Sequence, residues 1–101
     1  MTFPVEFEPD AQADFDEAAD WFYDQGGADL KAYFIRSVES TLSIIGRSPF
    51  SFPVVLGSSA RRAIVLKFPY AIFFTLKEDM VVIQSVFHTS RNPIIWRGRI
   101  D

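Results

Sequence analysis

The C-terminal part of this 101-residue sequence contains residue types that acid–base chemistry and phosphate binding use. His88 is the single histidine, and Arg91 follows three positions later. Histidine gains or loses a proton near neutral pH, and arginine can hold two phosphate oxygens at once. Together they could supply the acid–base group and the anion clamp for cleavage of a phosphodiester. The alternative is that His88 is a hydrogen-bonded residue at the end of a strand.

Further cationic and aromatic residues accompany this pair. Trp96, Arg97 and Arg99 could stack on a base and hold phosphates, or Trp96 could anchor a tail that folds back over a sheet. Arg61 and Arg62 are successive residues of an expected strand, so their side chains point to opposite faces. Only one of the two can therefore reach a given site.

Metal and cofactor chemistry find little support in the sequence. With no cysteine and one histidine, the chain lacks the usual ligands of a zinc site. The glycines match neither a phosphate-binding loop nor a dinucleotide-binding fingerprint. Acidic residues recur at helical spacing from Asp14 to Asp24, as they do on any solvated helix face. We therefore expect no metal and no cofactor.

The elements that must position the C-terminal residues begin with a strand and two helices. Residues 3–7 alternate apolar and polar side chains, the pattern of a strand that Pro9 is expected to end. Asp10 is the expected N-cap of a helix whose apolar stripe is Phe15, Ala18, Ala19 and Phe22. The glycine pair at 26–27 breaks it, and a second helix follows with the stripe Leu30, Phe34, Val38, Leu42 and Ile45. We expect the two helices to form a hairpin.

Three strands are expected after a crossing loop at residues 47–59. They cover residues 60–68, 70–78 and 80–88, with a boundary at Phe68-Pro69-Tyr70 and a hairpin turn at residues 77–79. The last two strands are apolar on both faces, and helices can cover only one. The other face needs a second copy, another protein or the C-terminal tail. The order β-α-α-β-β-β predicts one α+β domain over residues 1–101, with antiparallel strands after the helical hairpin.

Three adjacent aromatic residues stand on the first expected helix. Trp21, Phe22 and Tyr23 cannot all fit one apolar stripe. At least one of them should face a loop or a partner.

Charge divides the chain into two halves. Residues 1–50 carry ten acidic and three basic residues, a net charge of −7, whereas residues 51–101 carry three acidic and seven basic ones, a net charge of +4. Such asymmetry can mark an anionic partner for the basic half, or simply a solvated acidic helix beside a sheet rimmed with arginine. The N-terminus shows no secretory leader and no apolar run is long enough for a membrane helix, so the cytoplasm is the expected location.

The segments 61–74 and 81–99 together resemble the RelE/ParE superfamily of bacterial toxins from type II toxin–antitoxin systems, and its ParE-like branch in particular. The similarity rests on Arg62, the Phe68-Pro69-Tyr70 boundary, the apolar strand into His88, and the C-terminal residues Arg91, Pro93, Trp96 and Arg97. The helix with Trp21-Phe22-Tyr23 is also similar to the family. The resemblance implies a helical hairpin on one face of the sheet and a toxin, often of a plasmid stabilisation system, that a cognate antitoxin neutralises by wrapping it.

This resemblance implies one of two targets, which are DNA gyrase and ribosome-bound messenger RNA. In a ribonuclease, the catalytic candidates are Arg62, His88 and Arg91. For either target, the expected contact residues are Arg62, Lys67, Tyr70, His88, Arg91, Trp96 and Arg97. The expected antitoxin contacts are Trp21, Phe22 and the edge of the sheet.

Electrostatics favours the gyrase-type or another protein-targeting toxin. Binding to ribosomal RNA depends on lysine and arginine contacts to phosphates. This chain has an isoelectric point near 5.0 and only three lysines. A ribosome-dependent endoribonuclease is the second hypothesis, and a homologue without toxicity that serves as a binding module is the third.

Overall fold

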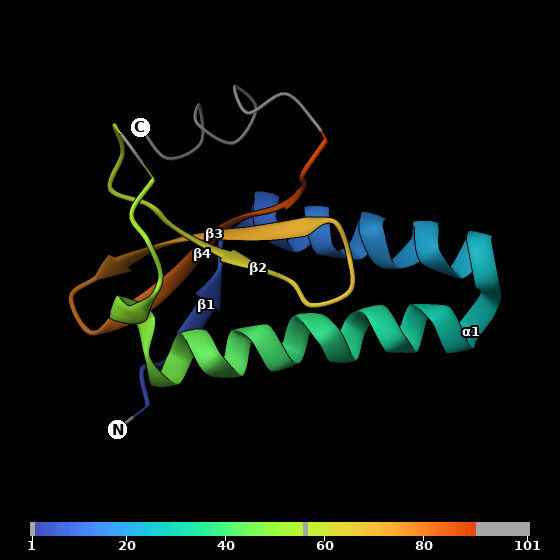
Figure 1. The fold of residues 1–101 in the computed structure, drawn as a ribbon, viewed down its shortest axis with the longest axis horizontal. Helices are drawn as coiled ribbons and strands as arrows, with labels where there is room; N and C mark the ends of the chain where they lie inside the picture. The colour runs from blue at the N-terminus through green and yellow to red at the C-terminus, as the bar shows by residue number, and fades with distance from the viewer. Residues whose placement is uncertain (1, 56, 91–101) are drawn as a thin grey trace.

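The structure, a computed structural model, describes residues 2–55 and 57–90. Strand β1 (Val5–Phe7) leads into helix α1 (Pro9–Arg47) and the short 3-10 helix η1 (Pro49–Ser51). Strands β2 (Arg61–Ile64), β3 (Tyr70–Lys77) and β4 (Met80–His88) follow. Figure 1 shows the four strands as one sheet beside the long helical segment. This arrangement is the α+β fold that the sequence predicts.

Helix α1 has two arms that turn back on each other, as the glycine pair predicts. Gly26 and Gly27 leave helical geometry, and Gly27 has a φ of 74° and a ψ of −165°, a conformation that is essentially restricted to glycine. The first arm therefore ends at this pair and the second begins after it (Figure 1). The expected N-cap was wrong, because Glu8 is the cap residue and Pro9 opens the helix. The backbone N–H of Glu8 donates to the carbonyl of Ile83, which joins the start of α1 to β4.

The sheet has the strand order β1-β4-β3-β2. β2, β3 and β4 pair antiparallel as predicted, whereas β1 pairs parallel with β4. The first of the expected later strands, residues 60–68, is shorter than predicted. β2 ends at Ile64 because Val65 donates its N–H to the Tyr70 carbonyl and Lys67 adopts a left-handed conformation with a φ of 68°. Residues 65–69 thus form the turn into β3.

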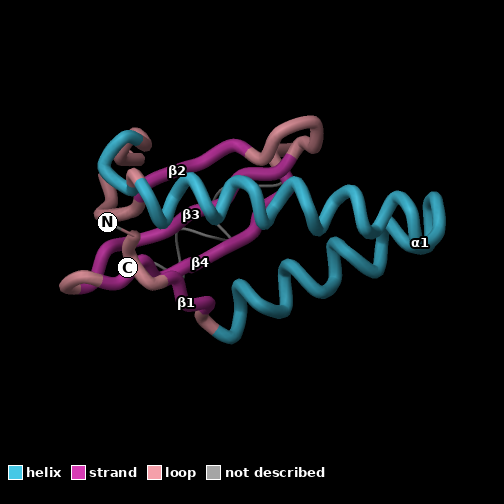
Figure 2. The backbone as a smooth tube through the Cα atoms, turned by 90° about the horizontal axis from the view of Figure 1, so that it is seen from below, coloured by secondary structure: helices cyan, strands magenta, loops and turns pink. Residues whose placement is uncertain are grey.

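The main core lies between the sheet and the two arms of α1, which both lie on the same face (Figure 2). Phe34 and Val38 of the second arm are fully buried against Ile72, Phe74 and other strand residues. A smaller cluster of Ala71, Phe73 and Phe87 lies apart from the main core, with Val55 of the crossing loop packed against it. Both faces of β3 and β4 are therefore buried, as their apolar sequence predicts. No helix in the described part of the chain is both long and apolar enough to cross a membrane.

Candidate functional site

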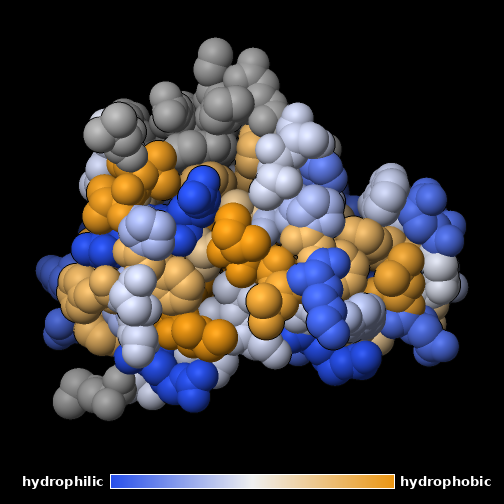
Figure 3. Space-filling model, in the orientation of Figure 1, coloured by the Kyte–Doolittle hydropathy of each residue, from blue (hydrophilic) through white to orange (hydrophobic). Residues whose placement is uncertain are grey.

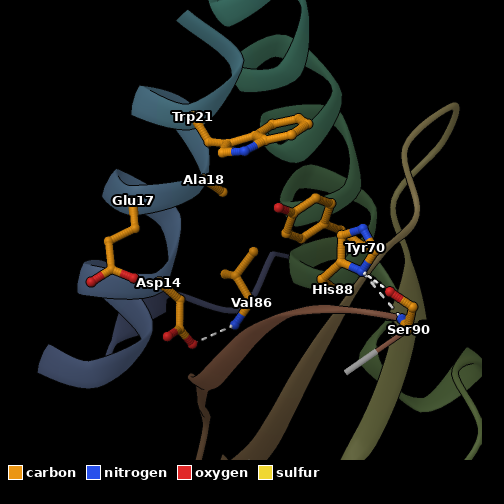
Figure 4. Close-up of a pocket in the computed structure, with 8 residues that line it drawn as sticks. All are labelled: Asp14, Glu17, Ala18, Trp21, Tyr70, Val86, His88 and Ser90. Atoms are coloured by element: carbon orange, nitrogen blue, oxygen red, sulfur yellow. Dashed lines mark hydrogen bonds between the residues drawn. The ribbon is translucent and has the colours of Figure 1, made fainter. Parts of the chain in front are cut away.

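A pocket of about 490 Å³ opens between the first arm of α1 and the paired ends of β3 and β4. Figure 4 shows it with its walls: the helix arm forms one side, and the Tyr70 and His88 rings form the other. The lining residues are Asp14, Glu17, Ala18, Trp21, Tyr70, Val86, His88 and Ser90. The single histidine of the sequence therefore lies in a pocket and not merely at a strand end.

His88 is held by contacts with two neighbours. Its ring meets the Tyr70 ring edge-on, with 5.1 Å between the centroids, because the two residues are direct partners in the β3–β4 pairing. The backbone N–H of Ser90 lies 3.2 Å from Nδ1, and the Ser90 hydroxyl lies 2.6 Å from the same atom (Figure 4). A backbone N–H can only donate, so we infer that Nδ1 accepts and that the neutral ring carries its proton on Nε2.

A bulge in β4 determines which residues of this strand face the helix. Phe73 pairs with Ser85 and Phe74 pairs with Ile83, so Gln84 is an extra residue with no residue opposite it in the β3–β4 register. This extra residue shifts the alternation of side chains between the two faces of the sheet by one position. Ile83 before the bulge and Val86 after it consequently both belong to the main core, and His88 lies on the same side.

Asp14 joins the first arm of α1 to this bulge. Its Oδ2 accepts a hydrogen bond from the Val86 backbone N–H at 3.1 Å (Figure 4) and one from the Ser85 hydroxyl at 3.3 Å. Ser85 is 1% exposed, so its hydroxyl has little access to water. The carboxylate therefore satisfies two donors that the bulge exposes toward the helix, and it fixes the helix arm opposite His88.

The electrostatics of the pocket is acidic in the described part of the chain. Asp14 and Glu17 are among the lining residues, and no lysine or arginine within residues 2–55 or 57–90 lines it. The surrounding sequence has the same sign, because residues 1–30 contain nine acidic residues and no basic one. The first basic residue, Lys31, pairs with Asp20 at 3.7 Å. The described lining thus contributes negative charge to this pocket, which favours a positively charged group over a negative one.

Three of the predicted site residues meet in the pocket. Tyr70 and His88 were expected to contact the target, and Trp21 was expected to contact the antitoxin. Trp21 is 54% exposed, so one of the three adjacent aromatics does face outward as predicted. Phe22, the other expected antitoxin contact, is only 7% exposed and packs on Phe34 in the main core. Its burial leaves Trp21 as the accessible member of the pair.

Two predicted cationic residues in the described part of the chain, Arg62 and Lys67, do not join them. Arg62 pairs with Phe73, whose side chain belongs to the smaller cluster, so Arg62 lies on the face of the sheet opposite to His88. Lys67 is exposed in the turn before β3, with its Nζ 6.0 Å from the centre of the Tyr33 ring. The predictions for Arg91, Trp96 and Arg97 concern residues that lie outside the described part of the chain.

Asp14, Glu17 and Ser90 are pocket residues that sequence reasoning did not select. Asp14, Ala18 and Trp21 stand at i, i+4 and i+7, a helical stripe that shares Ala18 with the apolar one. That spacing was visible in the sequence, but any solvated helix face can show it. It points to a pocket only once a strand is known to lie opposite this face. Within residues 2–55 and 57–90, no group of three histidine, cysteine or acidic side chains is placed to hold a metal ion.

Comparison with known proteins decides the family. Residues 5–93 match the family model described as the ParE toxin of the type II toxin–antitoxin system parDE. The chain belongs to the ParE toxin family. A solved structure described as the chromosomal ParDE toxin–antitoxin system from P. aeruginosa superposes with a TM-score of 0.77. It covers 88% of this chain and 98% of the matched one at 13% identity, so it shows a shared fold. No curated protein sequence gives a significant match.

Proposed function

We propose that this ParE family member is a growth-inhibiting bacterial toxin of the cytoplasm, acting on a protein target such as DNA gyrase without cleaving RNA. A cognate antitoxin neutralises it, and the pair serves in plasmid stabilisation or an equivalent chromosomal role. The family supports the toxin–antitoxin part of this proposal. The choice of a protein target rests on the structure of the pocket.

One observation carries that choice, namely the acidic lining around His88. Ribonucleases that act by acid–base catalysis stabilise the charge that develops on the phosphate with cationic groups close to the reacting atoms. Around His88, the described lining offers the carboxylates of Asp14 and Glu17 instead. Arg62, one of the residues that a ribonuclease would require beside His88, lies on the other face of the sheet. Among the residues that the structure describes, no cation therefore lines the pocket beside His88, and this supports a protein target.

Growth measurements test the toxin part of the proposal. Induction of this chain alone should arrest growth, and co-expression of the neighbouring antitoxin gene should restore it. Continued growth without the antitoxin, at a confirmed level of folded protein, would leave only the binding-module hypothesis.

Assays with purified components test the target. The proposal expects inhibition of gyrase supercoiling or of another protein activity, and no cleavage of ribosome-bound messenger RNA. Cleavage of the message at a protein concentration that leaves gyrase unaffected would replace this proposal with the endoribonuclease hypothesis.

A matched pair of substitutions separates the two faces of the sheet as target surfaces. His88→Ala removes the ring in the pocket, whereas Arg62→Ala removes a cation from the opposite face. We propose that both contact the target, as the sequence predicts together with Lys67, Tyr70 and the C-terminal residues Arg91, Trp96 and Arg97. Each single variant should then weaken growth arrest while keeping its folded stability. Full growth arrest by the His88→Ala variant would show that the pocket is not part of the surface that contacts the target.

We propose that the antitoxin contacts Trp21 and the exposed apolar residues near β2. Ile64 is 54% exposed and Leu66 is 65% exposed, and Figure 3 shows hydrophobic side chains gathered at the surface in this region. Exposed apolar area of this kind is typical of a surface that a partner covers. A Leu66→Asp variant should therefore remain toxic and escape neutralisation, whereas complete neutralisation would place the antitoxin elsewhere.

A further inference from the structure

We propose that the His88 pocket binds the side chain of an arginine supplied by the antitoxin. This inference rests on the proposed function for the identity of the partner, but arginine binding itself can be tested on the toxin alone. The pocket combines an exposed indole, a tyrosine ring and an acidic rim, a set of groups that fits a planar cation. It also lies where the predicted antitoxin contact Trp21 meets the predicted target contacts Tyr70 and His88.

The aromatic walls provide the first part of the argument. Trp21 is 54% exposed and its indole extends over the pocket from the first arm of α1 (Figure 4). Its ring is steadied by an edge-on contact with the buried Phe22, with 5.0 Å between the centroids. An exposed indole fixed in this way offers its face to a guanidinium, which stacks on aromatic rings better than an ammonium does.

The acidic rim provides the second part. Glu17 lies one turn before Trp21 on the same helix arm, and its exposed carboxylate turns toward solvent in Figure 4. Within residues 2–55 and 57–90 it makes no recorded hydrogen bond or ion pair, so rotation about its side-chain bonds can bring it to a cation above Trp21. Asp14 is engaged with the bulge but adds its negative charge at the base of the pocket. Carboxylates only accept hydrogen bonds and a guanidinium only donates them.

The same described features favour an arginine over other occupants. An RNA or DNA phosphate would approach a segment with nine acidic residues and no basic one among residues 1–30. An uncharged apolar side chain could fill the space but would gain nothing from the acidic rim. A lysine would feel the charge but could not stack as a plane or bind a carboxylate with two parallel hydrogen bonds.

Titration with a small probe tests the pocket directly. We expect Nα-acetyl-arginine-N-methylamide to shift the indole N–H signal of Trp21 in a saturable way, with a dissociation constant on the order of 1 to 10 mM for one side chain. The citrulline analogue has nearly the same shape without the charge and should bind at least about five-fold more weakly. Equal binding of the two probes, or no saturable shift with either, would overturn the proposal.

Matched variants assign the binding to the pocket. Glu17→Gln should weaken binding of the arginine probe by about three-fold. Asp24→Asn, an equal charge change at an exposed position of the same arm, should leave this binding unchanged. Trp21→Ala should remove most of the affinity for the probe. Tyr23→Ala removes an equally exposed ring that does not line the pocket, so it should leave the affinity unchanged. Equal losses within each pair would mean that the probe binds the acidic arm in general.

A last measurement identifies the antitoxin as the source of the arginine. When the labelled toxin is purified in complex with its antitoxin, the probe should no longer shift signals from the pocket. Continued binding of the probe to the complex would refute the assignment to the antitoxin, even if the free toxin binds arginine. If the chain proves not to be neutralised by any antitoxin, the proposed function fails. The titration of the free protein still shows whether the pocket binds arginine.

Discussion

Asp14→Ala tests whether the carboxylate that joins the helix to the bulge in β4 stabilises the fold. The substitution removes the acceptor of the Val86 backbone N–H and of the Ser85 hydroxyl. A hydrogen bond to a charged group contributes about 1.5 to 3 kcal/mol, and a buried donor left unsatisfied costs about 1 to 3 kcal/mol. Asp14 is partly exposed, so we take the lower end of these ranges and expect a loss of about 2 kcal/mol.

Urea unfolding followed by circular dichroism measures this loss. For a domain of this size the same change should lower the melting temperature by about 10 °C. Asp14→Asn keeps one oxygen acceptor and should lose about half as much. Asp16→Ala is the matched control, because Asp16 is exposed on the same arm and bonds only to Gln12 in the contacts recorded for it. It should change the stability by less than about 0.5 kcal/mol, and equal losses for Asp14→Ala and Asp16→Ala would refute the reasoning.

Three further substitutions probe the fold around the site. Phe34→Ala should cost about 3 to 5 kcal/mol in urea unfolding, because the ring is fully buried beneath the sheet, and a loss below about 2 kcal/mol would contradict that core. Gly27→Ala should cost about 1 to 3 kcal/mol by the same assay, because alanine does not tolerate this backbone conformation although space for its Cβ is open, and unchanged stability would mean that the turn is built differently. Ser85→Ala combined with Asp14→Ala should cost less than the sum of the two single changes, and strict additivity would show that the two side chains do not interact.

Much of the fold could be predicted because local patterns and tertiary packing agree. The apolar stripes of the two helical arms are the stripes that pack on the sheet, and the glycine pair at 26–27 marks the turn between them. The apolar character of residues 71–74 on both faces matches their burial on both faces. Where periodicity and burial coincide in this way, the sequence carries the information directly.

The features that the sequence did not predict depend mostly on partners far away in the chain. Nothing near Val5 in the sequence shows that its strand pairs parallel with β4, because that pairing depends on a segment more than seventy residues away. Lys67 continues the strand pattern in sequence, yet the bond between Val65 and Tyr70 closes a turn there. Asp10 was expected to cap the helix, but the fixed φ of Pro9 suits the first helical position, so the helix begins at Pro9 with Glu8 as its cap.

The candidate site was partly predictable for the same reason. His88 and Tyr70 were selected by their residue types and positions, and their pairing across β3 and β4 brings them together. The bulge at Gln84 left no signal in the sequence, although it affects which face of the sheet carries His88. Asp14 gave a helical-spacing signal, but its role depends on the backbone N–H of Val86, which no sequence pattern displays.

The most direct test of the central claim is to map RNA ends in cells in which this ParE family member is induced without an antitoxin. The acidic pocket around His88 and the position of Arg62 on the opposite face predict growth arrest with intact messenger RNA. New 5′ ends within translated messages, appearing on induction of the wild-type chain and absent with the His88→Ala variant, would contradict the account and identify the protein as a ribosome-dependent endoribonuclease.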